Sequence, residues 1–398
     1  DQIRRTGHEP KTDKMIAVGQ VFLPRTDFAA QERCRTIVES EVLRMGHYIY
    51  GWRHVPVNTE VLGEKANATR PEIEQILIRC EKDMDQEKFE RELYIIRRRI
   101  EKAATAAGIA GVYICSLSCR SIIYKGMMLA EQVAEFYPDL MDARFESAFA
   151  IYHQRYSTNT FPQWSLAQPF RMLAHNGEIN TLKGNVNWMR SHEIRMASNA
   201  FGDRAEDIKP IIPSGASDSS ALDSVFEVLV RAGRNAPMAK TMMVPEAWSQ
   251  QAVEMPQAWQ DMYGYCNAVM EPWDGPAALA MTDGRWVCGG LDRNGLRPLR
   301  YVVTGDGLLV AGSEVGMVPI DEATVVEKGA LGPGQMIAVD MQDGRLYHDK
   351  ELKDKLAAAQ PFSEWVERVV DLNNLMRDVP EKALFEGAEL RKRQVAAG

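Results

Sequence analysis

Apolar runs and amphipathic stretches alternate through the first third of the chain and predict a mixture of strands and helices. Met15 to Leu23 is short, apolar and followed by Pro24, which is typical of a buried strand. Thr26 and Asp27 are candidate N-cap residues for a helix that is expected to reach Leu43. Further strands are expected at residues 47–57, 112–117 and 121–124.

Two later segments have the spacing of amphipathic helices. In the first, apolar residues separated by four, three and four positions form one face. They are Phe89, Leu93, Ile96 and Ile100. The second helix is expected to begin near Asp218, whose carboxylate suits an N-cap, and to end with Gly233 at its C′ position.

Strand and turn patterns dominate the middle and late parts of the chain. Residues 145–153 alternate between apolar and polar positions, and a short strand from Leu173 to His175 is expected to break at the turn dipeptide Asn176-Gly177. Hairpins are predicted at three Asp-Gly dipeptides, namely Asp283-Gly284, Asp306-Gly307 and Asp343-Gly344. These patterns, without a strict βαβ order, indicate the α+β class, with antiparallel sheet covered by helices.

Composition and charge narrow the functional classes. Of 398 residues, 45% are hydrophobic and 26% are charged, which is typical of a globular protein. The net charge of −8 argues against nucleic acid as a partner, and no apolar run is long enough to cross a bilayer. The basic clusters 97–99 and 391–393 lie among glutamates and are interpreted as solvated helix faces.

Cysteine usage indicates a protein of a reducing compartment, and the absence of known motifs bears on cofactors and metals. Six cysteines are too sparse for a disulfide scaffold, and Cys115 and Cys119 are interpreted as buried thiols rather than metal ligands. The first residues have no signal-peptide pattern, so a cytoplasmic location is expected. We find no phosphate loop, dinucleotide-binding fingerprint or zinc-protease motif, and therefore predict no cofactor-binding or metal-binding residues in this chain.

Three polar segments could together bind an α-amino acid whose side-chain carbonyl is attacked. Arg155 presents a planar fork suited to a carboxylate. The Asn176 amide and the Gly177 N–H could both point at a developing oxyanion, and Asp218 offers an anion for an ammonium group. His153 and His175 lie in these segments, but a lone histidine on a strand is more often structural than catalytic.

Each of these residues also has a purely structural interpretation. Arg155 could form an internal ion pair, Asn176-Gly177 could be a plain hairpin turn, and Asp218 could act only as an N-cap. Composition and spacing alone do not join the three segments into one site.

Five long stretches of the chain carry a resemblance to a known family. They are IYHQRYSTNTFPQWSLAQPFRMLAHNGEINTLKGNVNWM from Ile151, SDSSALDSVFEVLVRAGR from Ser217, LDRNGLRPLRY from Leu291, GEKANATRPEIEQ from Gly63 and LYIIRRRIEKA from Leu93. The sequence of these stretches resembles the glutaminase domain of glutamate synthase large subunits, which is a class II glutamine amidotransferase. The resemblance is found on both sides of the predicted site segments. It extends from about Met15 through the rest of the chain.

The resemblance implies a fold, a domain organisation and site roles. The implied fold is the N-terminal-nucleophile hydrolase four-layer αββα sandwich, incomplete at its N-terminus, over residues 1–365, with 366–398 as a linker or the start of the central synthase domain. Arg155 would bind the α-carboxylate of L-glutamine, Asp218 its α-ammonium, and Asn176 and Gly177 the oxyanion. Asp292 to Pro298 is expected to be scaffolding, with Arg293 and Arg297 in internal ion pairs.

The family nucleophile is a cysteine at the mature N-terminus, whose own α-amine acts as the base. This sequence starts at Asp1, and an internal cysteine has no free α-amine, so we expect a fragment that is inactive alone. By this resemblance, enzymes of the family hydrolyse L-glutamine to glutamate and ammonia. The ammonia is then used with 2-oxoglutarate to make a second glutamate. The partners that the resemblance implies are the synthase domain of the same polypeptide, carrying FMN and an iron–sulfur cluster, and a small β subunit that supplies electrons.

Two alternatives stay open at this point. The chain could be a non-catalytic module that binds glutamine or docks a domain, since it lacks the nucleophile. It could also belong to a phosphoribosyl or sugar-phosphate amidotransferase, although it has no phosphate-binding acceptor domain. The sequence does not identify the electron donor, the oligomeric state or the route of ammonia.

Overall fold

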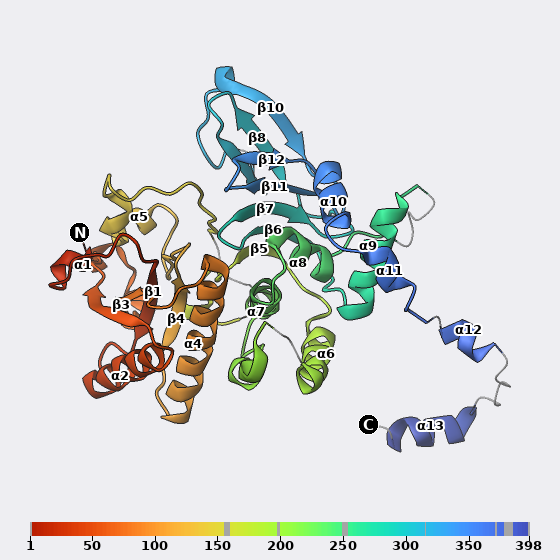
Figure 1. Ribbon diagram of the computed structural model, residues 1–398, viewed down its shortest axis with the longest axis horizontal. Coiled ribbons are helices and arrows are strands. Elements are labelled where there is room, and N and C mark those ends of the chain that lie inside the picture. Colours follow the sequence, from red (N-terminus) through yellow and green to blue (C-terminus); the bar gives the residue numbers. More distant parts are fainter. Residues whose placement is uncertain are drawn as a thin grey trace.

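The structure is a computed structural model that describes residues 2–154, 160–196, 200–248, 254–314, 316–370, 372–377 and 385–396. Its strands form three sheets, with the orders β2-β3-β1-β4, β12-β11-β7-β6-β5 and β10-β8-β9 (Figure 1). Every strand pair that joins β1 to β3 and β4, or β6 to β5 and β7, is antiparallel. The predicted α+β class with antiparallel sheets is confirmed.

The first sheet is covered on one face by two long helices, α2 and α4. Asp27 is the N-cap of α2, because its side chain accepts a hydrogen bond from the backbone N–H of Ala30 at 2.9 Å. The strands are β1 Ile16–Leu23, β2 Tyr48–His54, β3 Glu72–Arg79 and β4 Tyr113–Ser118. The helices in this part of the chain are α1 Gln2–Arg5, α2 Phe28–Arg44, α3 Glu64–Ala68, α4 Gln86–Ala106 and α5 Gln132–Phe136.

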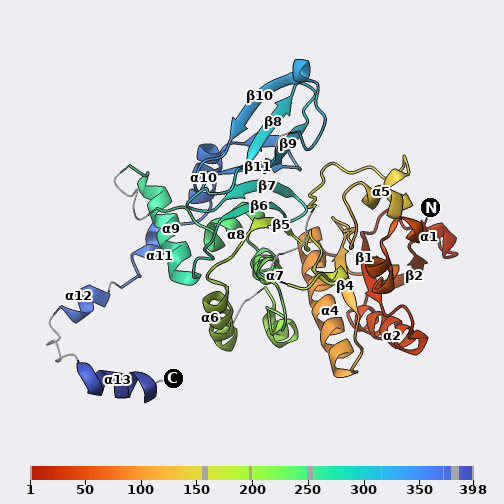
Figure 2. The same ribbon diagram turned by 180° about the vertical axis from the view of Figure 1, so that it is seen from behind.

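Helix α4 lies between the two halves of the molecule (Figures 1 and 2). The four apolar residues whose spacing predicted it pack into the core under the first sheet. Tyr94 and Ile95, on its other side, belong to the core of the second half. Helix α4 therefore contributes apolar side chains to both hydrophobic cores. Because both of its sides are packed in this way, few of its residues are exposed.

The five-stranded sheet is the scaffold of the second half, and helices α7 and α8 pack on one of its faces. Its strands are β5 Leu173–Gly177, β6 Ala277–Thr282, β7 Trp286–Leu291, β11 Met336–Asp340 and β12 Arg345–Tyr347. The three-stranded sheet lies beside it (Figure 1) and contains β8 Arg300–Thr304, β9 Leu309–Gly312 and β10 Val325–Ala330. All three predicted Asp-Gly turns join hairpin strands, namely β6–β7, β8–β9 and β11–β12.

The remaining helices cover these sheets or extend from them. They are α6 Leu182–Arg195, α7 Asp218–Arg231, α8 Ala236–Met243, α9 Gln257–Val269, α10 Asp349–Ala357, α11 Phe362–Val366, α12 Leu372–Met376 and α13 Gly387–Ala396. Helix α7 ends as predicted, with Gly233 at C′ and a left-handed φ of 102°. No helix among the described residues is long and apolar enough to span a membrane.

Two predicted strands are wrong, and the strands β3 and β10 were not predicted. Residues 121–124 and 145–153 have no strand partner. The backbone N–H of Ile123 instead donates to the Ser116 hydroxyl at 3.2 Å, which replaces a ladder hydrogen bond. Strand β3 was missed, although it is central in its sheet, because its first half mixes glutamates with apolar residues.

The interpretation of residues 97–99 as a solvated helix face is also wrong. Arg97 is 3% and Arg98 is 5% exposed. Arg97 forms an ion pair with Glu227 of α7 at 2.5 Å, and Arg98 donates to the carbonyl oxygens of Ile208 and Pro210. The mixed charge pattern could not reveal that the acidic partner of Arg97 lies on a distant helix.

Candidate active site

Asn176 and Gly177 lie inside an edge strand, not in a hairpin turn. Their strand, β5, pairs with β6, where Asn176 faces Ala278 and Gly177 faces Ala277. The turn predicted for this dipeptide is therefore wrong, because the strand that pairs with β5 comes from a distant part of the sequence. The period-two pleat places Ala174 and Asn176 on one side of the strand and His175 on the other.

Gly177 allows two backbone segments to approach each other very closely. A Cβ at this position would lie 1.7 Å from the carbonyl oxygen of Pro276, and its φ is 150°. Gly275 has the reciprocal constraint, since its Cβ would lie 1.9 Å from the carbonyl oxygen of Glu178. Only glycine fits at these two positions. The backbone near Gly177 is therefore in direct contact with the backbone of the segment at Gly275 and Pro276.

Replacing Gly177 by alanine is expected to lower the free energy of unfolding by about 3 kcal/mol, because the added methyl group meets backbone and φ becomes strained. Urea denaturation followed by circular dichroism measures this change. Gly184 in α6 is the matched control, because nothing lies within 4 Å of its Cβ position. Gly184→Ala is expected to be neutral or slightly stabilising, and equal losses in the two variants would contradict the account.

The loop after Gly177 is fixed by further hydrogen bonds. The N–H of Glu178 donates to the carbonyl oxygen of Pro276 at 3.0 Å, and the N–H of Asn180 donates to that of Asp274 at 2.8 Å. The Asp274 carboxylate in turn receives two hydrogen bonds from Arg293, at 3.1 and 2.5 Å. The ion pair expected for Arg293 is thus present, whereas none is found for Arg297 within the described part of the chain.

Asp218 is attached to the same loop. It is the first residue of α7 and is 7% exposed, and the N-cap is Ser217, whose hydroxyl accepts from the N–H of Ser220 at 3.1 Å. The prediction that Asp218 is the N-cap is therefore wrong by one residue. One Asp218 carboxylate oxygen accepts a hydrogen bond from the N–H of Ile179 at 3.1 Å. The structure thus brings together two of the three predicted site segments.

His175 supports Asp218 from inside the protein. It is 2% exposed, and its Nδ1 lies 2.9 Å from the hydroxyl of Ser219, which donates to Asp218 at 3.3 Å. Burial lowers the pKa of His175 to about 4, although the nearby Asp218 carboxylate acts in the opposite direction. The imidazole is therefore neutral at pH 7 and can donate from Nδ1 to the Ser219 hydroxyl.

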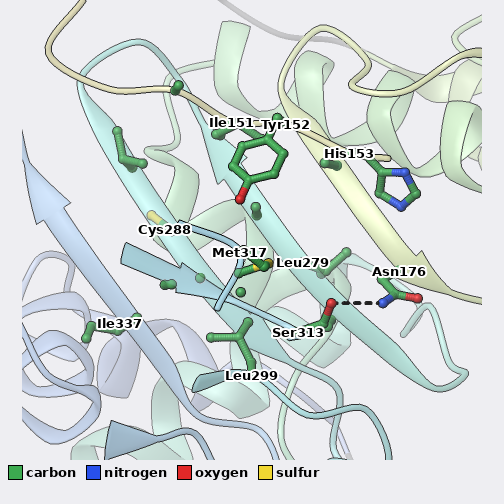
Figure 3. A pocket seen from close by; sticks show the side chains of 18 of the residues that line it. Ile151, Tyr152, His153, Asn176, Leu279, Cys288, Leu299, Ser313, Met317 and Ile337 are labelled. Carbon is green, nitrogen blue, oxygen red and sulfur yellow. Dashed lines mark hydrogen bonds between the residues drawn. The ribbon is translucent and has the colours of Figure 1, made fainter. Parts of the chain in front are cut away.

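A cavity of about 170 Å³ lies beside Asn176, between the five-stranded and three-stranded sheets (Figure 3). Tyr152, His153 and Asn176 are among its polar lining residues. The Asn176 Nδ2 donates to the hydroxyl of Ser313 at 3.1 Å. Sequence reasoning missed Ser313, which carries no motif and follows the short strand β9.

Arg155, the residue predicted to bind a carboxylate, lies outside the described residues. His153, two positions earlier, lines the cavity beside Asn176. The described part of the chain contains no group of three His, Cys, Asp or Glu residues that could hold a metal ion.

Over most of its length the chain matches a class of glutamine-using enzymes. A family model described as "Glutamine amidotransferases class-II" matches residues 1–365, and the chain belongs to this family. Its helices and antiparallel sheets are consistent with the N-terminal-nucleophile hydrolase fold of the class.

Relatives of this chain carry more specific names. It is 62% identical to the "Glutamate synthase [NADPH] large chain" of Azospirillum brasilense over 100% of its length, which is 26% of that protein. It is 45% identical to the chloroplastic ferredoxin-dependent glutamate synthase of Spinacia oleracea, with 96% of this chain and 24% of the relative covered. It is 41% identical to the "Glutamate synthase [NADPH] large chain" of Bacillus subtilis, with 96% of this chain and 25% of the relative covered. The chain spans about a quarter of the length of these relatives.

Proposed function

We propose that this chain is the glutaminase part of a glutamate synthase, which hydrolyses L-glutamine to L-glutamate and ammonia. The observation that carries the proposal is the hydrogen bond from the Ile179 N–H to Asp218. It attaches a candidate ammonium-binding carboxylate to the loop that follows Gly177, in a chain that belongs to the class II amidotransferases.

Each site residue has a distinct role in the proposed reaction. Asp218 binds the α-ammonium of glutamine, and Arg155 binds its α-carboxylate through a two-pronged contact. The Asn176 side chain and the Gly177 N–H stabilise the negative charge that develops on the amide oxygen when a nucleophile attacks the carbonyl carbon. Ammonia then leaves, and water releases glutamate from the enzyme.

We assign the nucleophile to an N-terminal cysteine as in the rest of the class, and not to a cysteine of this chain. All six cysteines here are free thiols. Each lies at an internal position of the sequence and therefore has no free α-amine. Burial raises the pKa of Cys115 and of Cys266 to about 12, which keeps these thiols protonated and poorly nucleophilic at pH 7.

The greater length of the relatives supports a place for this glutaminase in a larger enzyme, to which we assign a cytoplasmic location. The ammonia would convert 2-oxoglutarate into a second glutamate in the synthase domain of the same polypeptide, which residues 366–398 would join to the amidotransferase domain of residues 1–365. FMN and an iron–sulfur cluster would supply the redox chemistry there, and a small β subunit would supply electrons. The described residues include no group of three His, Cys, Asp or Glu that could hold a metal ion, so they do not fit a metal cluster.

The proposal is tested by incubating the glutamate synthase polypeptide that carries this chain with L-glutamine and 2-oxoglutarate. We expect glutamine consumption that depends on the nucleophile cysteine, with two molecules of glutamate formed per glutamine when electrons are supplied. Tight binding of L-glutamine without any ammonia release would favour a non-catalytic glutamine-binding module instead.

A further inference from the structure

The Asn176 side chain is oriented by a contact to another sheet. Its backbone is fixed by the pairing of β5 with β6, opposite Ala278, so only the two side-chain torsions remain free. The hydrogen bond from Nδ2 to the Ser313 hydroxyl, at 3.1 Å, is the only one found for this side chain within the described ranges. Figure 3 shows the Asn176 amide turned toward Ser313, and both residues line the cavity.

Ser313 is itself held in place. It directly follows β9, whose last residue, Gly312, pairs with Arg300 of β8. The Met317 side chain packs against Gly312 so closely that a Cβ there would lie 1.9 Å from the Met317 methyl group. The hydroxyl of Ser313 is therefore presented from the end of a paired strand of the three-stranded sheet, whereas Asn176 belongs to the five-stranded sheet.

We propose that Ser313 is a positioning residue for the oxyanion site, an inference that rests on the proposed glutaminase function. An asparagine amide has two N–H donors, and a hydroxyl oxygen can accept from one of them. With one N–H held by Ser313, the planar amide is fixed, and its second N–H stays available for the oxyanion. A fixed donor stabilises the transition state better than one that must be ordered during the reaction.

Ser313 does not need to touch glutamine in this role, so its loss should change turnover more than binding. In the glutamate synthase that carries this chain, Ser313→Ala is expected to lower the glutamine-dependent kcat by about tenfold, as expected for one hydrogen bond, with KM changed less than about twofold. Ser313→Thr keeps the hydroxyl and should retain most of the activity. Ser363→Ala, an exposed position on α11, is the matched control and should leave kcat unchanged.

A double-variant cycle separates positioning from a general structural effect. If Ser313 acts through Asn176, Ser313→Ala adds no loss to Asn176→Ala, whereas an independent structural effect would multiply the two losses. Ser313→Cys, which keeps the shape but is a poor hydrogen-bond partner, should reproduce the tenfold loss and covers the case in which the alanine variant folds poorly.

The results that overturn the inference are distinct from those that overturn the proposed function. A large loss in Asn176→Ala with full activity in both Ser313→Ala and Ser313→Cys would overturn the positioning role alone. Multiplicative losses in the double variant would do the same. Unchanged kcat in Asn176→Ala would overturn the oxyanion assignment, and the role of Ser313 with it.

Discussion

Asn176→Ala is expected to lower the glutamine-dependent kcat by about 10²–10³, the usual cost of removing one oxyanion donor. The amide contacts the charge only as it develops, so KM for L-glutamine should change by less than about threefold. Steady-state kinetics of ammonia release from L-glutamine measure both constants. The effect should be large because the Asn176 amide is held at the cavity by Ser313.

Two comparisons make this result specific to the oxyanion site. Ammonia-dependent glutamate synthesis by the same variant should stay near the wild-type rate, because free ammonia bypasses glutamine hydrolysis. Asn176→Asp should be at least as impaired as the alanine variant, since a carboxylate repels the oxyanion. If glutamine affinity were lost while turnover at saturation held, Asn176 would be a ground-state binding residue and its assignment would be wrong.

Arg97→Met is expected to lower the free energy of unfolding by about 3–5 kcal/mol, because it leaves a buried carboxylate without its cation. The side chains of Arg97 and Glu227 are only 4% and 6% exposed, and they join α4 to α7 at 2.5 Å. Glu227 also lies near Asp223, which is fully buried and whose pKa is raised to about 6 by burial and by the Glu227 charge. Urea denaturation at pH 7 measures the loss.

The buried environment, and not the loss of a positive charge as such, should account for this effect. Arg4 forms an ion pair with Glu9 at 3.2 Å but is exposed, so Arg4→Met should cost less than about 1 kcal/mol. The double variant Arg97→Met, Glu227→Leu should recover much of the stability. A deficit equal to that of Arg4→Met would contradict the account.

Local patterns predicted much of the fold, and distant contacts account for the errors. The helices through Ile96 and Asp218 and the Asp-Gly hairpins follow from spacing and turn chemistry, which involve residues close in sequence. The burial of Arg97 depends on Glu227, and the strand at Asn176 depends on β6. Both partners lie about a hundred residues or more away, so no local pattern contains them.

The same distinction applies to the candidate site. Residue chemistry nominated Asn176, Gly177 and Asp218, and the structure attaches Asp218 to the loop after Gly177 through the Ile179 N–H. Ser313 could not be found in this way, because it is one serine after a short strand and its contact crosses from one sheet to another. The close backbone approach at Gly177 was equally hidden, since an Asn-Gly dipeptide is more typical of a hairpin turn.

In the proposed site, one bound glutamine is held at both ends while its amide oxygen enters a prepared oxyanion site. The most direct measurement is a crystal structure of the glutamate synthase in complex with L-glutamine, with its nucleophile cysteine replaced by alanine. We expect the amide oxygen within roughly 3.5 Å of the Asn176 Nδ2 and the Gly177 N, with the α-ammonium on Asp218 and the α-carboxylate on Arg155. A glutamine bound elsewhere, or bound here without contact to either Asp218 or Asn176, would contradict this expectation.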